Sequence, residues 1–256
     1  MKIAHISDLH FFFPYPSSHL FGISLIGYIN AFLRRRNFFI TKYLDDCIAS
    51  LIRDEIEILI ITGDFTTTAD PKEFLMAKDF LQKVSDAGIK VHAIPGNHDT
   101  YTKESFKSKM FYSRLDILPK LSAEKIHPKW DLILLDNTIL NKPFRANGSF
   151  QLEQKEQLEK ILENCKNVII ANHFPFIDKL THHNLFNSKA LKKILKKHHG
   201  TVIYLCGHTH VTSYTQMDGN VHIFNSSETT VVHKHKYHQI TLLDDIFSYK
   251  EVKYHE

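Results

Sequence analysis

The sequence contains little cysteine and has no apolar run long enough to suggest a membrane span. Its three cysteines, Cys47, Cys165 and Cys206, are odd in number and lack the paired spacing of a zinc site. We therefore expect buried free thiols in a reducing compartment rather than a disulfide framework. The longest nonpolar stretch, residues 20–33, contains Gly, Ser and Asn and is too short to cross a bilayer comfortably. The N-terminus also lacks the apolar core of a secretory signal, so we expect a cytoplasmic protein.

The chain also lacks a concentrated basic stripe. Its formal net charge is +4, and its Lys and Arg residues are spread along the sequence. This distribution permits a nucleic-acid partner without demanding one, and the chain is too short to hold a dedicated nucleic-acid module. Hydrophobic residues make up 43% of the chain and charged residues 23%, which is typical of a globular protein. We predict one domain over residues 1–256 and leave its oligomeric state open.

Strand-like runs rich in Ile and Val alternate with helical patterns, which indicates the α/β class. The apolar periodicity predicts four helices, at about residues 40–53, 71–87, 151–165 and 189–199. The C-terminal runs VHIFNSS, YHQITLLDD and SYKEVKYHE are instead typical of short strands. We expect this C-terminal part to complete a second sheet packed on the first.

Five of the strand-like runs end in side chains of types that can bind metals. The polar groups are Asp8-Leu9-His10, Gly63-Asp64, Gly96-Asn97-His98-Asp99, Asn172-His173 and Gly207-His208-Thr209-His210. Ligands of α/β proteins gather outside the carboxyl ends of the strands. We therefore expect these groups to converge on one site.

The residue types in this set indicate a binding site for hard or borderline divalent ions rather than a structural zinc site. Carboxylate, amide and imidazole groups suit hard or borderline divalent ions, and the set contains no cysteine. Asp8 and His10 can both turn toward one ion, whereas His208 and His210 could supply one ligand to each of two ions. Asp64 lies between these pairs in the sequence, and the two oxygens of its carboxylate could bridge the two cations.

Two ions about 3.5 to 4 Å apart would polarise a phosphoryl group, generate hydroxide from a bridging water and support in-line displacement. The predicted reaction is therefore phosphoester hydrolysis. His98 is left over after the ligands are counted, and its imidazole could protonate the leaving oxygen or neutralise developing charge. Asp99 is the candidate to orient His98, in the manner of a carboxylate–histidine pair.

These motifs resemble those of the calcineurin-like metallophosphoesterases. The pattern of that family is D-x-H, GD, GNHD, a lone His and GHxH, and it stands here, in order, as DLH, GDF, GNHD, NH and GHTH, within roughly residues 1–225. The resemblance implies a four-layer α/β sandwich of two mixed β-sheets flanked by helices, with His98 as the catalytic histidine. It also implies that one ion is bound by Asp8, His10, Asp64 and His210, and the other by Asp64, Asn97, His173 and His208. The metals are two divalent or mixed-valence ions, with Mn, Fe, Zn and Ni all left open.

Among the subgroups of that family, the sequence is most similar to the class III cyclic-nucleotide phosphodiesterases. The first hypothesis is therefore attack of metal-bound hydroxide on a phosphodiester, such as a cyclic nucleotide. The alternative is a pyrophosphatase acting on a lipid-linked or nucleotide-sugar substrate such as UDP-diacylglucosamine, although the better-known branch of those enzymes carries GNRD where this chain has GNHD. A repair-type nuclease and an inactive scaffold are further hypotheses.

The apolar insertion at residues 11–38 separates His10 from the helix that leads to Asp64. One interpretation is a cap packed on the domain. The other is an apolar wall with a basic end at residues 34–36, suited to a lipid-linked phosphate or to peripheral contact with the inner face of a membrane. Outside the insertion, Arg145 and Asn147 are candidates to meet an anionic substrate. Asn172 either contacts the phosphate or caps its own turn.

Overall fold

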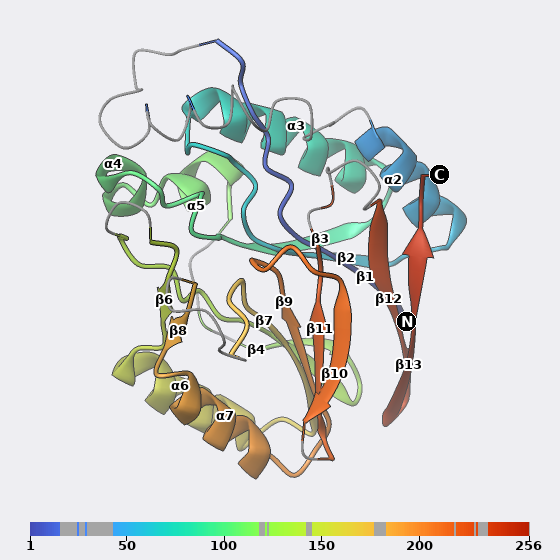
Figure 1. Cartoon of the computed structure of the whole chain (residues 1–256). Coiled ribbons are helices and arrows are strands. Elements are labelled where there is room, and N and C mark those ends of the chain that lie inside the picture. The colour runs from blue at the N-terminus through green and yellow to red at the C-terminus, as the bar shows by residue number, and fades with distance from the viewer. Residues whose placement is uncertain are drawn as a thin grey trace.

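The computed structural model describes residues 1–15, 25, 29, 43–117, 121, 123–141, 145–176, 183–217, 219–227, 229 and 235–255. Within these residues, two mixed β-sheets lie face to face between two layers of helices (Figure 1). This arrangement confirms the predicted four-layer sandwich. Most of the predicted insertion at residues 11–38 falls outside the described residues, so its role as a cap stays a prediction.

The first sheet has five strands. Their order across the sheet is β13 (Ile246–Lys253), β12 (Lys236–Leu243), β1 (Lys2–Ile6), β2 (Ile58–Thr62) and β3 (Lys90–Ile94). Strands β1, β2 and β3 are parallel, whereas β12 is antiparallel to both of its neighbours. The carboxyl ends of the three parallel strands therefore meet at one edge of the sheet.

The second sheet has six strands. Their order is β10 (Ser213–Met217), β11 (Val221–Asn225), β9 (Val202–Cys206), β7 (Asn167–Ala171), β5 (Trp130–Leu134) and β4 (Ala123–His127). The four central strands, from β11 to β5, are parallel. A small third sheet pairs β6 (Gly148–Ser149) with β8 (Leu185–Phe186).

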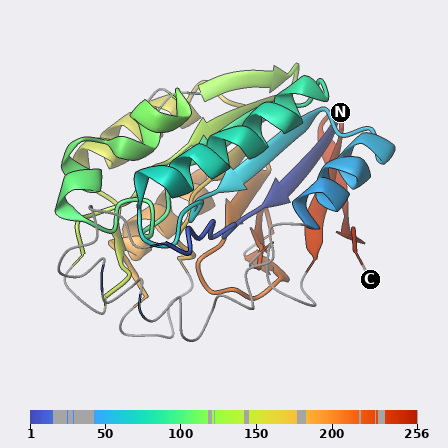
Figure 2. The ribbon, with the colours of Figure 1, turned by 90° about the horizontal axis from the view of Figure 1, so that it is seen from above.

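Helices cover the outer face of each sheet. The helices whose bounds fall within the described residues are α2 (Leu44–Arg53), α3 (Pro71–Asp86), α4 (Lys103–Lys107), α5 (Met110–Leu115), α6 (Leu152–Leu162) and α7 (Ser188–Lys197). Figure 2 shows α2 and α3 lying over one face of the first sheet. Helices α6 and α7 pack on the second sheet through a separate apolar cluster. The four predicted helices are thus confirmed. The short helices α4 and α5 were not predicted, because neither has a long apolar stripe.

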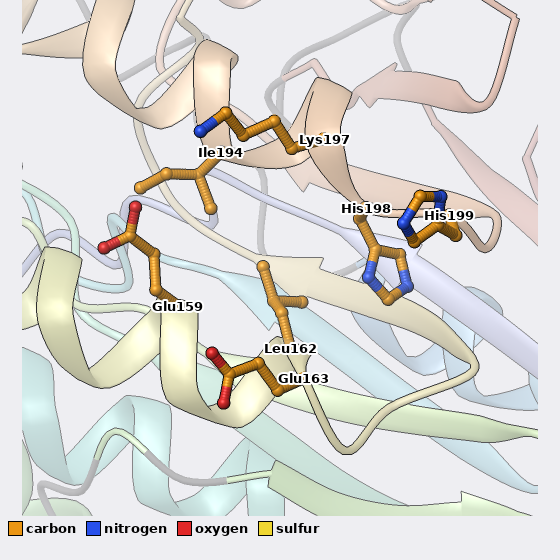
Figure 3. A pocket seen from close by; sticks show the side chains of 7 residues that line it. All are labelled: Glu159, Leu162, Glu163, Ile194, Lys197, His198 and His199. Carbon is orange, nitrogen blue, oxygen red and sulfur yellow. The ribbon is translucent and has the colours of Figure 1, made fainter.

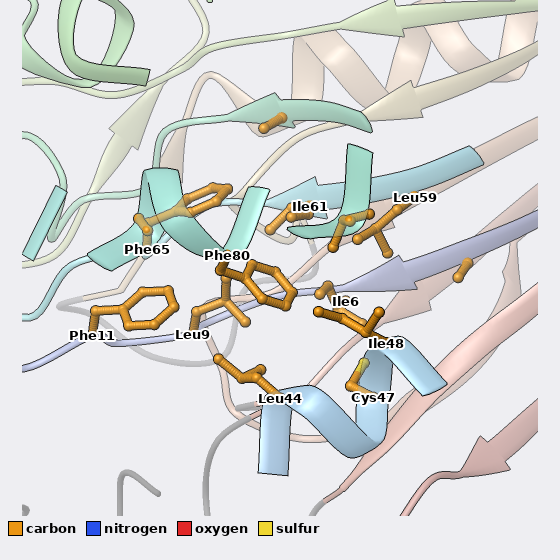
Figure 4. Packing of buried hydrophobic residues seen from close by; sticks show 14 of the residues in the cluster. Ile6, Leu9, Phe11, Leu44, Cys47, Ile48, Leu59, Ile61, Phe65 and Phe80 are labelled. Atoms are coloured by element: carbon orange, nitrogen blue, oxygen red, sulfur yellow. The ribbon is translucent and has the colours of Figure 1, made fainter. Parts of the chain in front are cut away.

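Three apolar layers hold the sandwich together, because alternate strand residues point to opposite faces of each sheet. In β1, Ile3 joins the layer between the two sheets, whereas Ala4 and Ile6 join the layer under α2 and α3. Figure 4 shows this outer layer, in which Leu44 of α2 and Phe80 of α3 lie over the strands. Burial on both faces explains why the parallel strands are continuous apolar runs.

The C-terminal part divides between the two sheets. Strand β11 joins the second sheet, as we expected, but β12 and β13 join the first sheet beside β1. The expectation that the whole tail completes a second sheet is therefore wrong. Periodicity identifies a strand and its buried face, but the partner of β12 is decided by long-range pairing such as Ile3 with Ile240.

None of the helices in the described ranges is long and apolar enough to cross a membrane. The three cysteines are free, with Cys47 and Cys206 buried and Cys165 half-buried. The expectation of buried free thiols is thus confirmed for two of the three.

Candidate active site

The predicted ligands converge at one edge of the sandwich, where the carboxyl ends of β1, β2, β3, β7 and β9 meet (Figure 1). Ligand atoms within 4.8 Å of one another form three overlapping groups of potential metal ligands. These groups are Asp8 with His10 and His210, His10 with Asp64 and His98, and Asp64 with His173 and His208. Polar side chains from both sheets therefore form one continuous cluster, with Asp64 at its centre.

One part of the cluster, which we call the open half, consists of Asp8, His10 and His210. His210 Nε2 lies 3.2 Å from Asp8 Oδ1 and 3.4 Å from His10 Nε2. His10 Nε2 in turn lies 3.9 Å from Asp64 Oδ2. The side chain of His210 is 26% exposed, so this half reaches solvent.

The other part, which we call the closed half, consists of Asn97, His173 and His208, and it also faces Asp64. His173 Nε2 lies 3.1 Å from Asn97 Oδ1, 3.1 Å from His208 Nδ1 and 3.4 Å from Asp64 Oδ2. All four side chains are buried. Asp64 Oδ2 alone approaches both halves, whereas Oδ1 accepts from His98 N, so bridging by both oxygens of this carboxylate stays a prediction.

The backbone at these strand ends is strained. Five of the predicted ligands have positive φ, namely Asp8 at 56°, His10 at 47°, Asp64 at 51°, His208 at 70° and His210 at 57°. Left-handed conformations of non-glycine residues cost free energy and cluster at functional sites. Here the strain turns each side chain out of its strand and toward the cluster.

The glycines before the ligands permit close approach of the turns. Gly63 has φ of +92°, and a Cβ there would lie 2.6 Å from Gly96 N and 2.8 Å from His173 Nδ1. A Cβ at Gly96 would overlap the Asp64 carboxylate. Larger residues at these positions would therefore push the ligand turns apart.

The donor set fits divalent cations. His173 Nδ1 donates to the Thr62 carbonyl at 2.7 Å, which leaves the Nε2 lone pair facing Asn97 Oδ1 and His208 Nδ1. Asp8 Oδ1 is buried and accepts no hydrogen bond from the described residues. Uncompensated buried charge is costly, so acceptor atoms that converge in this way suit a cation between them.

The pKa values of the buried site residues are shifted by the charged and polar groups that lie close together in the cluster. Burial alone would lower the pKa of His173, but the neighbouring Asp64 carboxylate outweighs it and raises the pKa to about 9. Burial opposes ionisation of Asp64 as well, yet His173, His98 and His10 hold its pKa well below the usual range. Burial and the adjacent His173 lower the pKa of His208, which keeps its imidazole neutral. The carboxylates of the cluster thus favour positive charge where the ligand atoms converge, which is also the place that a bound cation would take.

His98 lies at the edge of the cluster with a fixed ring orientation. Its Nδ1 donates to the Thr67 carbonyl at 2.7 Å, and its backbone N–H donates to Asp64 Oδ1 at 2.8 Å. The ring stands edge-on to His10, with centroids 4.9 Å apart, and stacks on Tyr101 at 5.5 Å. The partly exposed ring can therefore present Nε2 to a substrate.

The prediction that Asp99 pairs with the His98 ring is wrong. The Asp99 carboxylate accepts from the backbone N–H groups of Phe65, Thr66 and Gly96 and from the Thr66 hydroxyl. Its oxygens are occupied in tying the GNHD turn to the loop after β2, so Thr67 orients the ring instead. Burial, together with the charge of Asp64, raises the pKa of Asp99 to about 7.

Two positions that hydrogen-bond to predicted site residues or their neighbours were missed from the sequence. Thr67 acts through its main-chain carbonyl, for which no side-chain signal exists. Asn137 follows β5 in the run LILLDN and accepts a hydrogen bond from Asn172, next to His173. This run is another apolar strand followed by polar residues, so the same strand-end rule could have found Asn137.

The remaining candidates have structural partners. Asn172 Oδ1 accepts from Phe174 N at 3.0 Å, which supports the interpretation that it caps its own turn. Asn147 Oδ1 accepts from Asn184 N, and the exposed Arg145 keeps its substrate role as a prediction. A hollow of about 370 Å³ between α6 and α7 lies in the outer helical layer, and its lining includes none of the predicted site residues (Figure 3).

Known structures share this fold. A dimetal phosphatase from Danio rerio superposes with a TM-score of 0.71 at 15% identity, covering 100% of this chain and 97% of the other. A purple acid phosphatase from yellow lupin superposes with a TM-score of 0.66 at 12% identity, covering 99% and 51%. At such low identity these similarities establish the architecture alone.

Two curated proteins are similar in sequence. The 3',5'-cyclic-nucleotide phosphodiesterase alr5338 of Nostoc sp. is 24% identical over 237 residues, which cover 90% of this chain and 78% of the relative. The 3',5'-cyclic adenosine monophosphate phosphodiesterase CpdA of Haemophilus influenzae is 26% identical over 174 residues, which cover 65% of this chain and 59% of the relative. Residues 1–212 match the sequence profile described as calcineurin-like phosphoesterase. This chain therefore belongs to the calcineurin-like phosphoesterase family and is a metal-dependent phosphoester hydrolase.

Proposed function

We propose that the chain hydrolyses phosphodiesters of the cyclic-nucleotide class at a centre of two metal ions. The observation that carries this proposal is the sharing of Asp64 between the two halves of the cluster. A carboxylate with one oxygen facing both halves suits two cations held close together. Single-metal sites do not require such an arrangement.

The two ions would have separate ligand sets joined at Asp64. Asp8, His10 and His210 would hold the ion of the open half, and Asn97, His173 and His208 would hold the ion of the closed half. The mixture of nitrogen and oxygen donors fits Mn, Fe, Zn or Ni. When bound, the ions would supply Lewis acidity for the phosphoryl group and lower the pKa of water.

The residues of the chain supply positioning and a proton. The His98 Nδ1–H is held by Thr67, so Nε2 is the atom that would meet the leaving oxygen. Protonation of that oxygen by a placed imidazole accounts for about 10² to 10⁴ in rate in comparable systems. Asp99 holds the GNHD turn, and thereby keeps Asn97 and His98 in register with Asp64.

Cyclic nucleotides are favoured over the alternative substrates. Both curated relatives are cyclic-nucleotide phosphodiesterases, and this chain carries GNHD rather than the GNRD of the better-known UDP-diacylglucosamine hydrolases. The pyrophosphatase alternative depended on lipid contact through residues 11–38, which lie mostly outside the described residues. Peripheral contact with a membrane therefore remains a prediction for that segment.

The test is a substrate comparison with metal-stripped protein to which Mn²⁺ is returned. We expect turnover of cyclic AMP and bis(4-nitrophenyl) phosphate, and a loss of about 10² to 10⁴ in kcat for His98→Ala with unchanged metal content. Tyr101→Phe, which keeps the ring that stacks on His98, serves as the matched control. Turnover of a UDP-linked acyl sugar in preference to the diesters would overturn the substrate assignment.

A further inference from the structure

Glu73 is a buried carboxyl group at the start of α3, and its side chain receives more hydrogen bonds than a helix cap needs. The residue is 1% exposed. The N–H of Asp70 donates to it in a capping box at 3.4 Å. Four other donors come from the preceding loop and from a distant segment: Thr67 N at 3.1 Å, Thr68 N at 2.8 Å, Thr68 Oγ1 at 3.1 Å and Phe13 N at 3.4 Å.

The loop held by Glu73 is the loop that orients His98. The Thr67 carbonyl accepts from His98 Nδ1 at 2.7 Å, and its hydroxyl donates to the His10 carbonyl at 3.0 Å. Thr67 N also lies 3.1 Å from the carbonyl of Phe11. Three chain segments therefore meet at Thr67, and Glu73 lies directly behind it.

The geometry of one peptide unit connects the two side chains. The carbonyl of Thr67 and the N–H of Thr68 belong to the same planar trans peptide, so they point in opposite directions. Glu73 Oε2 accepts from that N–H on one side, while His98 Nδ1 donates to that carbonyl on the other. Rotation of this peptide would break both bonds together, and each bond polarises the group that makes the other.

We propose that Glu73 is a positioning residue for His98, acting through the Thr67–Thr68 peptide, and that it joins the first residues of the 11–38 segment to the same loop. This inference rests on the proposed function, in which His98 protonates the leaving group. Among the described residues, the Glu73 side chain makes no hydrogen bond to a predicted metal ligand or to His98. Its role is to keep the His98 ring in the tautomer and direction that the proton transfer requires.

The decisive measurement is the dependence of rate on the leaving group. A good leaving group such as 4-nitrophenol needs little protonation, whereas phenol needs it in the transition state. We expect Glu73→Ala to lower turnover of a phenyl diester about tenfold more than turnover of the matching 4-nitrophenyl diester. Equal losses on both substrates would mean that Glu73 only supports the fold, and would overturn the proposal.

Two further variants separate positioning from stability. Val84→Ala removes buried volume from the same helix, far from Thr67, and should lower the thermal midpoint without changing the ratio of the two rates. Glu73→Gln can place its amide oxygen where Oε2 accepts from Thr68, so it should restore most of the phenyl diester activity. In a His98→Ala background, Glu73→Ala should add no further selective loss, because coupled residues are not additive.

A structural readout keeps the proposal separate from the proposed function. The Nδ1–H proton of His98, bound to a buried carbonyl, should give a protected downfield NMR signal that disappears in His98→Ala. We expect Glu73→Ala to shift or broaden this signal and Val84→Ala to leave it in place. If the wild-type protein hydrolyses no phosphodiester, the proposed function fails while this spectrum still decides the role of Glu73. An unchanged signal in Glu73→Ala would contradict that role.

Discussion

The two halves of the ligand cluster contain similar chemical groups but differ in their contact with solvent. In the closed half, Asn97, His173 and His208 are each no more than 6% exposed, and the Thr62 carbonyl fixes the ring of His173. In the open half, His210 is partly exposed. Since ion exchange requires water to replace ligands, a cation in the open half should exchange faster than one in the closed half. Two ions in one site can therefore exchange at different rates although each would be held by two histidines and the shared Asp64.

The largest effect should come from removing the group that both halves share. Asp64→Ala takes away the carboxylate oxygen that lies 3.4 Å from His173 Nε2 and 3.9 Å from His10 Nε2. We expect both ions to be weakened and turnover to fall by at least about 1000-fold, since the lost electrostatic stabilisation amounts to about 4 kcal/mol. Metal content after dialysis and kcat for bis(4-nitrophenyl) phosphate would measure the two effects.

The matched control for Asp64 is Asp86→Ala, an exposed carboxylate at the end of α3. This variant should keep both the metal content and the rate of the wild-type protein. Loss of only one ion in Asp64→Ala would contradict the shared role, and would mean that the two halves bind independently.

A smaller and more selective effect should distinguish the halves from each other. We expect His210→Ala to lose one ion on dialysis, to fall about 100-fold in activity and to recover partly in excess Mn²⁺, because the remaining site is accessible. His208→Ala removes a buried ligand and should not recover, since a buried empty space beside His173 is left behind. Metal stoichiometry and the Mn²⁺ concentration for half-maximal activity provide the comparison. Equal behaviour of the two variants would remove the distinction between an open and a closed half.

The sequence predicted the ligands of the site better than it predicted which strands pair in each sheet. Apolar runs ending in Asp, Asn and His identify ligands because the carboxyl ends of parallel strands meet in any α/β layer. Helix α3 was equally predictable, since Pro71 at its start and Gly88 beyond its end are local signals. The placement of β12 and β13 was not predictable, because antiparallel pairing with β1 depends on residues more than two hundred positions apart.

The groups that orient the GNHD turn and the His98 ring were also beyond sequence reasoning. Asp99 was assigned to the His98 ring because the two are neighbours in GNHD. The Asp99 oxygens instead accept hydrogen bonds from three backbone N–H groups and the Thr66 hydroxyl. Thr67 and Glu73 act through a peptide unit whose orientation no side-chain pattern encodes. Ligand identity is thus a property of residue type, whereas ligand orientation is a property of the folded backbone.

The smallest effect should come from loosening the closed half without removing a ligand. Asn137 accepts a hydrogen bond from Asn172, the residue before His173, and donates to Gln154 at 2.7 Å. Asn137→Ala should weaken metal binding about 10-fold, the lower end of what loss of a supporting hydrogen bond costs. Asn147→Ala is the matched control. It removes a buried amide that accepts a hydrogen bond from Asn184 N, and Asn184 is not part of a turn that carries a predicted ligand. Both variants should lower the thermal midpoint, but only Asn137→Ala should raise the Mn²⁺ concentration for half-maximal activity. A similar rise in both would show that general loosening, rather than the position of the His173 turn, controls the affinity of the closed half.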